Sequence, residues 1–186
     1  MMLAIDTSSA RSAIALIDGE RVVAETVKPS GRDFDLAAEV AALAPDQALL
    51  DNVLVALGPG SFTGLRQGIA FAVGLAMSRG IPLLGIGTLD LAAARAREPA
   101  VVVVDAGRGR VYYQAPDGSR GVAAVSEVPR GWPAAGWLRD DGGLNLLPEA
   151  GLRTFADAVI AVRGAAREVG YGTVKPEYMM QFGRLD

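Results

Sequence analysis

A strand that ends in aspartate occurs twice in this 186-residue chain, and this repeat constrains the fold more than any other feature of the sequence. Leu3 to Asp6 (LAID) and Val101 to Asp105 (VVVVD) are short apolar runs, typical of buried strands. Each is followed by a turn of small residues, a second strand and an Asp-Gly pair, which is typical of a β-hairpin. Asp6 and Asp105 are 99 residues apart, and so are Asp18 and Asp117. Two landmarks at one separation predict a duplicated unit.

The segments between these landmarks alternate between strand and helix patterns. The architecture resembles that of the actin/hexokinase/Hsp70 superfamily, so we predict an α/β fold with two actin-like (ribonuclease H-like) lobes, each a mixed β-sheet covered by helices. We place the N-terminal lobe at 1–98 and a shortened C-terminal lobe at 99–186, whose tail, Pro176 to Phe182, docks back on the body. We expect strands at 3–6, 12–17, 21–27, 52–57, 81–86, 101–105, 111–114 and 144–147, and helices at 34–43, 62–78, 88–97 and 154–169.

Cysteine and histidine are both missing from the sequence. Their absence excludes zinc-thiolate sites, Ser-His-Asp triads and histidine-based metal sites, including those of metallopeptidases. The formal net charge is -3. The chain therefore lacks the clustered Lys and Arg that direct binding of nucleic acid requires. We expect no metal and no cofactor. The N-terminus has no signal-peptide pattern and no apolar run is long enough to cross a membrane, so we expect a cytoplasmic protein.

The segment Gly58 to Gly68 (GPGSFTGLRQG) leads from the buried strand at 52–57 into a helix. Ser61 or Thr63 can cap this helix and leave amides free at its positive end, which would suit an anion. The segment is not a P-loop, because no Lys-Ser/Thr pair follows the last glycine, and its glycine spacing is not that of a Rossmann fingerprint. Arg66 could bind an anion, or it could pair with a carboxylate of this chain or of a partner.

Candidate residues for a phosphate or a nucleotide gather at the turns that end the strands. In a nucleotide-binding protein, a turn such as Asp6-Thr7-Ser8-Ser9 offers hydroxyls and amides to a phosphate. The alternative is an ordinary turn whose side chains bond the local backbone. Together with the glycine segment and the repeat in the second lobe, the candidate set is Asp6, Thr7, Ser8, Gly60, Ser61 and Asp105.

Small residues recur every fourth position along the helix at 62–78. They form one smooth stripe, beside which lies a second, apolar stripe of Leu65, Ile69, Val73 and Met77. A smooth stripe accepts another element at short distance. Two interpretations stay open: the stripe packs on the protein's own sheet, or it contacts a helix of a second chain. The small residues are Gly64, Gly68, Ala72, Ala76 and Gly80.

These segments resemble the TsaB family (also called YeaZ), bacterial actin-fold proteins needed for N6-threonylcarbamoyladenosine formation in tRNA. The resemblance rests on LAIDTSS, GPGSFTGLRQG with its helix, and VVVVDAGRGRVYY. It implies a non-catalytic subunit that binds a TsaD-type paralogue, with a TsaE-type ATPase joining them and tRNA contacted only indirectly. The first two helices of the N-terminal lobe would form the contact, and the same surface could form a homodimer. Carried onto this chain, the partner-binding residues are Phe34, Ala38, Ala41, Gly64, Leu65, Arg66, Gly68, Ile69, Ala72, Val73 and Ala76.

The chain also departs from the family pattern. Gly31-Arg32-Asp33-Phe34 stands where many relatives have a His-Ser pair, and Asp105-Ala106-Gly107 where they often have Asp-Ala-Arg. The alternative function is a small ATP-binding phosphotransferase of the same fold. Such kinases are normally longer and carry an adenosine-binding Gly-Gly motif, whereas Gly142-Gly143, the only such pair here, lacks a strand-helix context.

Overall fold

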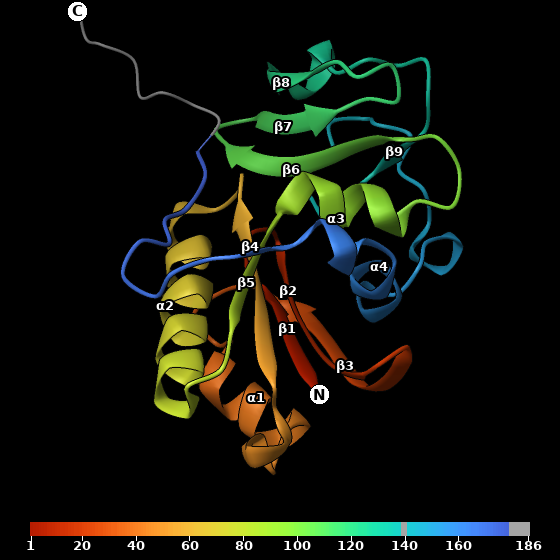
Figure 1. Cartoon of the computed structure of the whole chain (residues 1–186). Coiled ribbons are helices and arrows are strands. Elements are labelled where there is room, and N and C mark those ends of the chain that lie inside the picture. Colours follow the sequence, from red (N-terminus) through yellow and green to blue (C-terminus); the bar gives the residue numbers. More distant parts are fainter. Residues whose placement is uncertain (139–140, 179–186) are drawn as a thin grey trace, which may run out of the picture.

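A six-stranded mixed sheet forms the larger part of the computed structural model, which describes residues 1–138 and 141–178. Its strands follow the order β10-β5-β4-β1-β2-β3 (Figure 1). β1 is parallel to β4 and antiparallel to β2, and β4 is parallel to β5. The strands are β1 (Met2–Asp6), β2 (Arg11–Asp18), β3 (Arg21–Pro29), β4 (Asn52–Gly58), β5 (Leu83–Gly87) and β10 (Arg167–Glu168).

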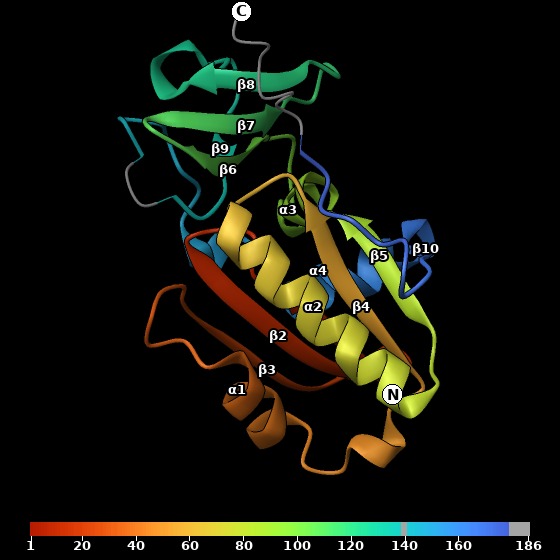
Figure 2. The ribbon, with the colours of Figure 1, turned by 90° about the vertical axis from the view of Figure 1, so that its left-hand side faces the viewer.

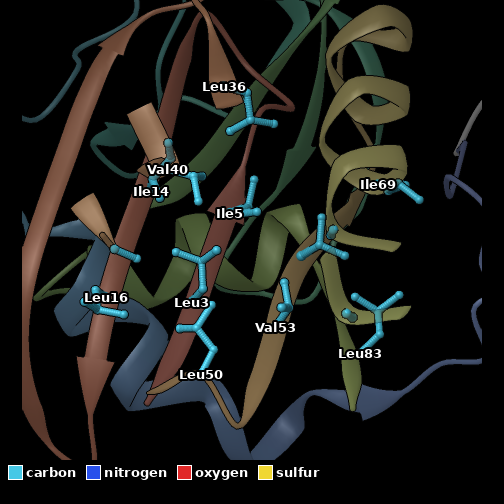
Figure 3. Close-up of a cluster of buried hydrophobic side chains, with 14 of the residues drawn as sticks. Leu3, Ile5, Ile14, Leu16, Leu36, Val40, Leu50, Val53, Ile69 and Leu83 are labelled. Carbon is cyan, nitrogen blue, oxygen red and sulfur yellow. The ribbon is translucent and has the colours of Figure 1, made fainter. Parts of the chain in front are cut away.

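Helices cover both faces of this sheet. α1 (Leu36–Leu43) and α2 (Phe62–Arg79) lie on one face, and α3 (Thr88–Arg95) and α4 (Phe155–Val162) lie on the other (Figures 1 and 2). Because both faces are covered, the central strands are apolar throughout: Leu3 and Ile5 point to α1 and α2, while Ala4 points to α4. Figure 3 shows the first of these two cores, with Leu3, Ile5 and Val53 of the central strands at its centre.

A second sheet stacks on the first through α3. Its strand order is β8-β7-β6-β9, with β6 antiparallel to β7 and parallel to β9. Leu91 of α3 packs in the core of the first sheet, and Leu89 of the same helix packs against Val102 and Val104 of the second. α3 therefore joins the two sheets. The strands are β6 (Val101–Gly107), β7 (Arg110–Gln114), β8 (Arg120–Ala124) and β9 (Ala134–Ala135).

The predicted actin-like α/β fold is confirmed, and the repeated strand turn has the same local structure in both copies. The Ser8 amide donates to Asp6 Oδ1 at 2.8 Å, and the Gly107 amide donates to Asp105 Oδ1 at 2.6 Å. Each aspartate thus bonds the amide two residues ahead, which is an Asx turn. The repeat in sequence reflects a repeat in backbone geometry.

Two predicted elements in the C-terminal part are shorter than expected. The helix predicted at 154–169 is confirmed with Thr154 as its N-cap, but it ends at Val162, because Gly164 lies in a 3-10 turn and the chain then turns to form β10. In that turn, Arg163 bonds the carbonyl oxygen of Gly19. The strand predicted at 144–147 is reduced to a single bridge between Ala134 and Leu146, because the neighbouring strand β9 has only two residues.

The last described residues return to the first sheet. β10 pairs with β5, and α4 packs on α3, so the segment from Phe155 onward contacts the N-terminal half of the chain. The Glu177 amide donates to the carbonyl oxygen of Leu57 at 2.6 Å. Of the tail predicted to dock at Pro176 to Phe182, positions 179–182 lie outside the described residues. The lobe division at residue 98 stays a prediction.

Candidate functional site

The turn after β1 and the glycine segment after β4 pack directly against each other. Thr7 Oγ1 donates to the carbonyl oxygen of Gly64 at 2.6 Å, and the Ser61 amide donates to the carbonyl oxygen of Ser8 at 2.7 Å. A Cβ atom on Gly60 or Gly64 would overlap the backbone carbonyl oxygens of Ser8 and Thr7. Glycine is therefore required at both positions for this close approach. The two motifs form one locked joint between β1 and α2.

This joint buries most of the predicted phosphate-binding groups. Asp6, Thr7 and Ser8 are all buried, and Thr7 and Ser8 lie directly against the glycine segment. Burial raises the pKa of Asp6, against the opposing effects of its hydrogen bonds to Ser8 and of Arg95. Asp6 and Ser9 therefore bond the local backbone, which is the alternative that the sequence left open. Thr7 instead bonds the carbonyl oxygen of Gly64, and the buried Ser8 hydroxyl has no hydrogen-bond partner among the described residues. A phosphate would have to separate the two turns to reach these groups.

Ser61 and Asp105 are the two phosphate candidates that are not fully buried. Ser61 is the N-cap of α2 and accepts from the Gly64 amide at 3.3 Å, as its sequence position predicted. Asp105 lies in the second sheet, where its carboxylate is taken up by the Gly107 amide. Ser61 and Asp105 therefore each stabilise a different turn of the backbone.

A small cavity lies between the two sheets. Asp6, Thr88 and Arg95 contribute to its wall, together with Trp137 and Phe155. Its volume is about 30 Å³, enough for one or two water molecules and far too small for a nucleotide. This geometry gives no support to the phosphotransferase alternative.

Arg95 fills one side of this cavity and connects the two sheets. Its guanidinium lies 4.2 Å from the ring centre of Trp137, forms an ion pair with Glu149 and donates from Nε to the carbonyl oxygen of Arg153 at 3.2 Å. The Glu149 carboxylate also accepts from Trp137 Nε1 at 3.1 Å. No local sequence pattern predicts this cluster, because its members are up to 58 residues apart.

From Gly64 to Ala76 the small-residue stripe of α2 faces the protein's own sheet, which is the first of the two interpretations that the sequence left open. A Cβ on Gly68 would overlap Thr7 Oγ1, so this glycine admits the turn after β1. Leu65 is 1% exposed and Ala72 and Ala76 are fully buried, because they line the core between α2 and the sheet. The expected partner-binding residues that are buried or partly buried are Phe34, Gly64, Leu65, Gly68, Ile69, Ala72, Val73 and Ala76.

The exposed surface on this side of the molecule is formed by other small residues. Ala38 and Ala41, both in the expected set, are exposed on α1, as are Ala37 and Ala42. On α2 the exposed positions opposite the buried stripe are Thr63, Gln67, Ala70, Gly74 and Met77. Figure 2 shows the two helices in the same layer. We refer to the exposed residues Ala37, Ala38, Ala41, Ala42, Thr63, Gln67, Ala70, Gly74 and Met77 as the α1/α2 face.

Four α2 members of this face could have been found from the sequence. Gln67, Ala70, Gly74 and Met77 follow helical spacing on the side opposite Leu65 and Ala72. Met77 is 64% exposed and no atom lies within 4 Å of a Cβ built on Gly74, so this surface is both apolar and open. The face is smooth because alanine and glycine project little from a helix.

Arg66 is the remaining expected contact residue, and it is exposed at the N-terminal end of α2. Its guanidinium carbon lies 3.8 Å from the ring centre of Phe62. The other ring neighbour of Phe62 is Tyr178, with ring centres 5.7 Å apart and an interplanar angle of 24°. Within residues 1–138 and 141–178, no three acidic side chains converge as a metal site would need, and no helix is long and apolar enough to span a membrane.

Comparison with known proteins identifies relatives of this arrangement. The family model "TsaD: tRNA N6-adenosine threonylcarbamoyltransferase" matches residues 35–124, just under half of the chain. An uncharacterised protein of Mycobacterium tuberculosis is 37% identical over 123 residues, which cover 60% of this chain and 57% of that protein. The tRNA threonylcarbamoyladenosine biosynthesis protein TsaB of Bacillus subtilis is 35% identical over 122 residues, which cover 60% of this chain and 52% of that protein. The chain thus matches little more than half the length of these curated relatives.

The structural likeness extends over nearly the whole chain. YeaZ from Pseudomonas aeruginosa superposes with a TM-score of 0.72, covering 95% of this chain and 98% of that one. The sequence identity in this superposition is 24%, so the match establishes the fold.

Proposed function

Because the chain belongs to the TsaB (YeaZ) family, we propose that it is a non-catalytic partner subunit in the formation of N6-threonylcarbamoyladenosine in tRNA. In this proposal it binds a TsaD-type threonylcarbamoyltransferase through the α1/α2 face, and a TsaE-type ATPase joins the complex. The same face allows a homodimer, and contact with tRNA is indirect. This assembly would take place in the cytoplasm.

The observation that carries this proposal is the composition of the α1/α2 face. Its centre consists of alanine and glycine on two neighbouring helices, with the exposed thioether of Met77 at one end. A smooth pair of helices lets two helices of another chain approach closely. The TsaD family model begins at residue 35, so the matched region includes both helices. A paralogue of similar fold would present a comparable pair.

The non-catalytic role is supported by the chemistry of the joint between β1 and α2. The Asp6 carboxylate and the Thr7 hydroxyl are already bonded to backbone groups of this chain, and the cavity between the sheets is too small for ATP. A subunit that binds a partner needs a rigid helix orientation, and the locked joint provides it.

The central test is a substitution in the middle of the face. Ala70→Arg places a long charged side chain where two helices would meet, and it should abolish co-purification with the TsaD-type protein of the same organism. The matched control is Ala150→Arg, at an exposed position in the C-terminal half of the chain. In cells, depletion of the chain should lower threonylcarbamoyladenosine in tRNA, and Ala70→Arg should fail to restore it. Unchanged modification after depletion would refute the proposed function.

A further inference from the structure

Arg66 is held in a fixed position at the edge of the α1/α2 face. Its guanidinium stacks on Phe62, and Phe62 in turn stacks on Tyr178. The segment that carries Tyr178 runs past the N-terminal end of α2 (Figure 1), where the Glu177 amide is bonded to the Leu57 carbonyl oxygen. Residues from two distant parts of the chain therefore support one exposed arginine.

The charge of Arg66 is not neutralised by a neighbouring residue. Among residues 1–138 and 141–178, the ion pairs involve Met1, Arg21, Lys28, Arg95, Arg163 and Arg167 as cations, and none involves Arg66. A guanidinium stacked on an aromatic ring keeps its N–H donors free at its edges, pre-arranged for a planar anion. The positive end of the α2 dipole adds to the potential there.

Two kinds of anion fit a guanidinium: a carboxylate of a protein and a phosphate of a nucleic acid. Binding of a nucleic acid backbone requires several cations at phosphate spacing. Along α2 the next cation is Arg79, 13 positions further along the helix, about 20 Å away at the helical rise. Along α2, Arg66 is thus a single cation beside the α1/α2 face, an arrangement that suits one carboxylate at the edge of a protein interface.

We propose that Arg66 is a specificity-determining residue of the α1/α2 face and pairs with a carboxylate of the TsaD-type protein that covers this face. This inference rests on the proposed function, since it requires a protein partner on that face. Phe62 and Tyr178 are positioning residues, because they hold the guanidinium in place. The C-terminal segment thereby contributes to partner recognition.

The experiment measures binding of the full chain to the TsaD-type protein of the same organism by calorimetry at several salt concentrations. Arg66→Glu should weaken binding about tenfold or more and flatten its dependence on salt, since a favourable charge pair becomes a repulsive one. The matched control is Arg79→Glu at the other end of α2, which should stay within about twofold of wild type. Tyr178→Ala should give a smaller loss than Arg66→Glu.

The outcomes separate this inference from the proposed function. Loss of binding in Ala70→Arg together with unchanged binding in Arg66→Glu overturns the role of Arg66 and leaves the interface in place. Unchanged binding in both variants overturns the proposed function itself. If Arg66→Glu binds the TsaD-type protein normally but loses retention of unmodified tRNA, the anion is a phosphate and the carboxylate assignment is wrong.

Discussion

The hydroxyl of Thr7 donates a hydrogen bond of 2.6 Å to the carbonyl oxygen of Gly64, 57 residues further along the chain. Thr7 lies in the turn after β1, and Gly64 lies in the first turn of α2. The bond therefore fixes the start of the helix against the central strand. This joint holds one end of α2, and the hydrophobic core packs along its length. The side of α2 that faces the solvent is therefore fixed as well.

Replacement of Thr7 by valine should test this joint. Valine has a similar shape but no hydroxyl, so the Gly64 carbonyl loses a partner that lies in a part-buried place. We expect a loss of about 1 to 2 kcal/mol in the free energy of unfolding, measured by urea denaturation. Thr63→Val, at an exposed position in the same helical turn, should change stability by less than about 0.5 kcal/mol. Equal effects of the two substitutions would contradict a special role for the bond.

Alanine substitutions at Gly64 and Gly74 of α2 should change the free energy of unfolding in opposite directions. A Cβ on Gly64 overlaps the Thr7 carbonyl oxygen, whereas a Cβ on Gly74 meets no atom within 4 Å. We expect Gly64→Ala to lower the free energy of unfolding by about 2 kcal/mol or more, because backbone must move. Gly74→Ala should raise it by up to about 1 kcal/mol, because alanine favours the helix. Urea midpoints of the two variants measure the contrast, and a stable Gly64→Ala protein would show that the joint is loose.

The fold could be predicted largely from local patterns. β1, β2 and β4 were found because both faces are buried and the apolar runs are continuous, as in Leu54 and Val55. The repeated turn could be predicted because Asp6 and Asp105 occupy matching positions, whereas the Asx geometry that both copies share is a finding of the structure. The C-terminal elements were not, because β10 exists only by pairing with β5, which lies more than 80 positions earlier in the chain.

The candidate site was predicted less well, for a reason that is visible at Gly68. A stripe of small residues indicates a close approach but does not identify what approaches. Here the neighbour is Thr7, from the protein's own turn. Likewise, nothing in the sequence places Tyr178 beside Phe62, because that contact depends on the path of the C-terminal segment. Helical spacing separates the two sides of α2, but only long-range packing shows what each side contacts.

Asp6 should make stability fall as the pH rises. Burial raises its pKa above the ordinary value of 3.8, so the native state holds a proton that the unfolded state has already released. Between 3.8 and the higher native pKa, each pH unit therefore costs up to about 1.4 kcal/mol. Asp6→Asn keeps an acceptor for the Ser8 amide but does not titrate. Urea midpoints from pH 4 to pH 8 should fall for the wild type relative to this variant.

Asp117 provides a control of opposite sign. The hydrogen bonds from Ser119 lower its pKa, so its stabilising effect is present above pH 3.8 and is lost on acidification. Asp117→Asn lacks that stabilisation. Its urea midpoint at neutral pH should therefore lie below that of the wild type in the same series. Parallel curves for wild type and Asp6→Asn across this range would mean that Asp6 does not titrate differently in the native state.

Arg95 should not tolerate lysine, although the charge is kept. It is 6% exposed, and its guanidinium stacks on Trp137 while Nε donates to the carbonyl oxygen of Arg153. An ammonium group cannot make the stacked contact and the sideways hydrogen bond together. We expect Arg95→Lys to lower the free energy of unfolding by about 2 kcal/mol, the sum of a desolvated cation–π contact and one hydrogen bond. Arg97→Lys, two residues further along and exposed, should have no measurable effect in the same urea titration.

Trp137 lies in the C-terminal half of the chain, whereas Arg95 lies in α3. The fluorescence of Trp137 should therefore report the loosened contact in the folded Arg95→Lys protein. An unchanged emission spectrum with unchanged stability would show that the two sheets are held together without Arg95.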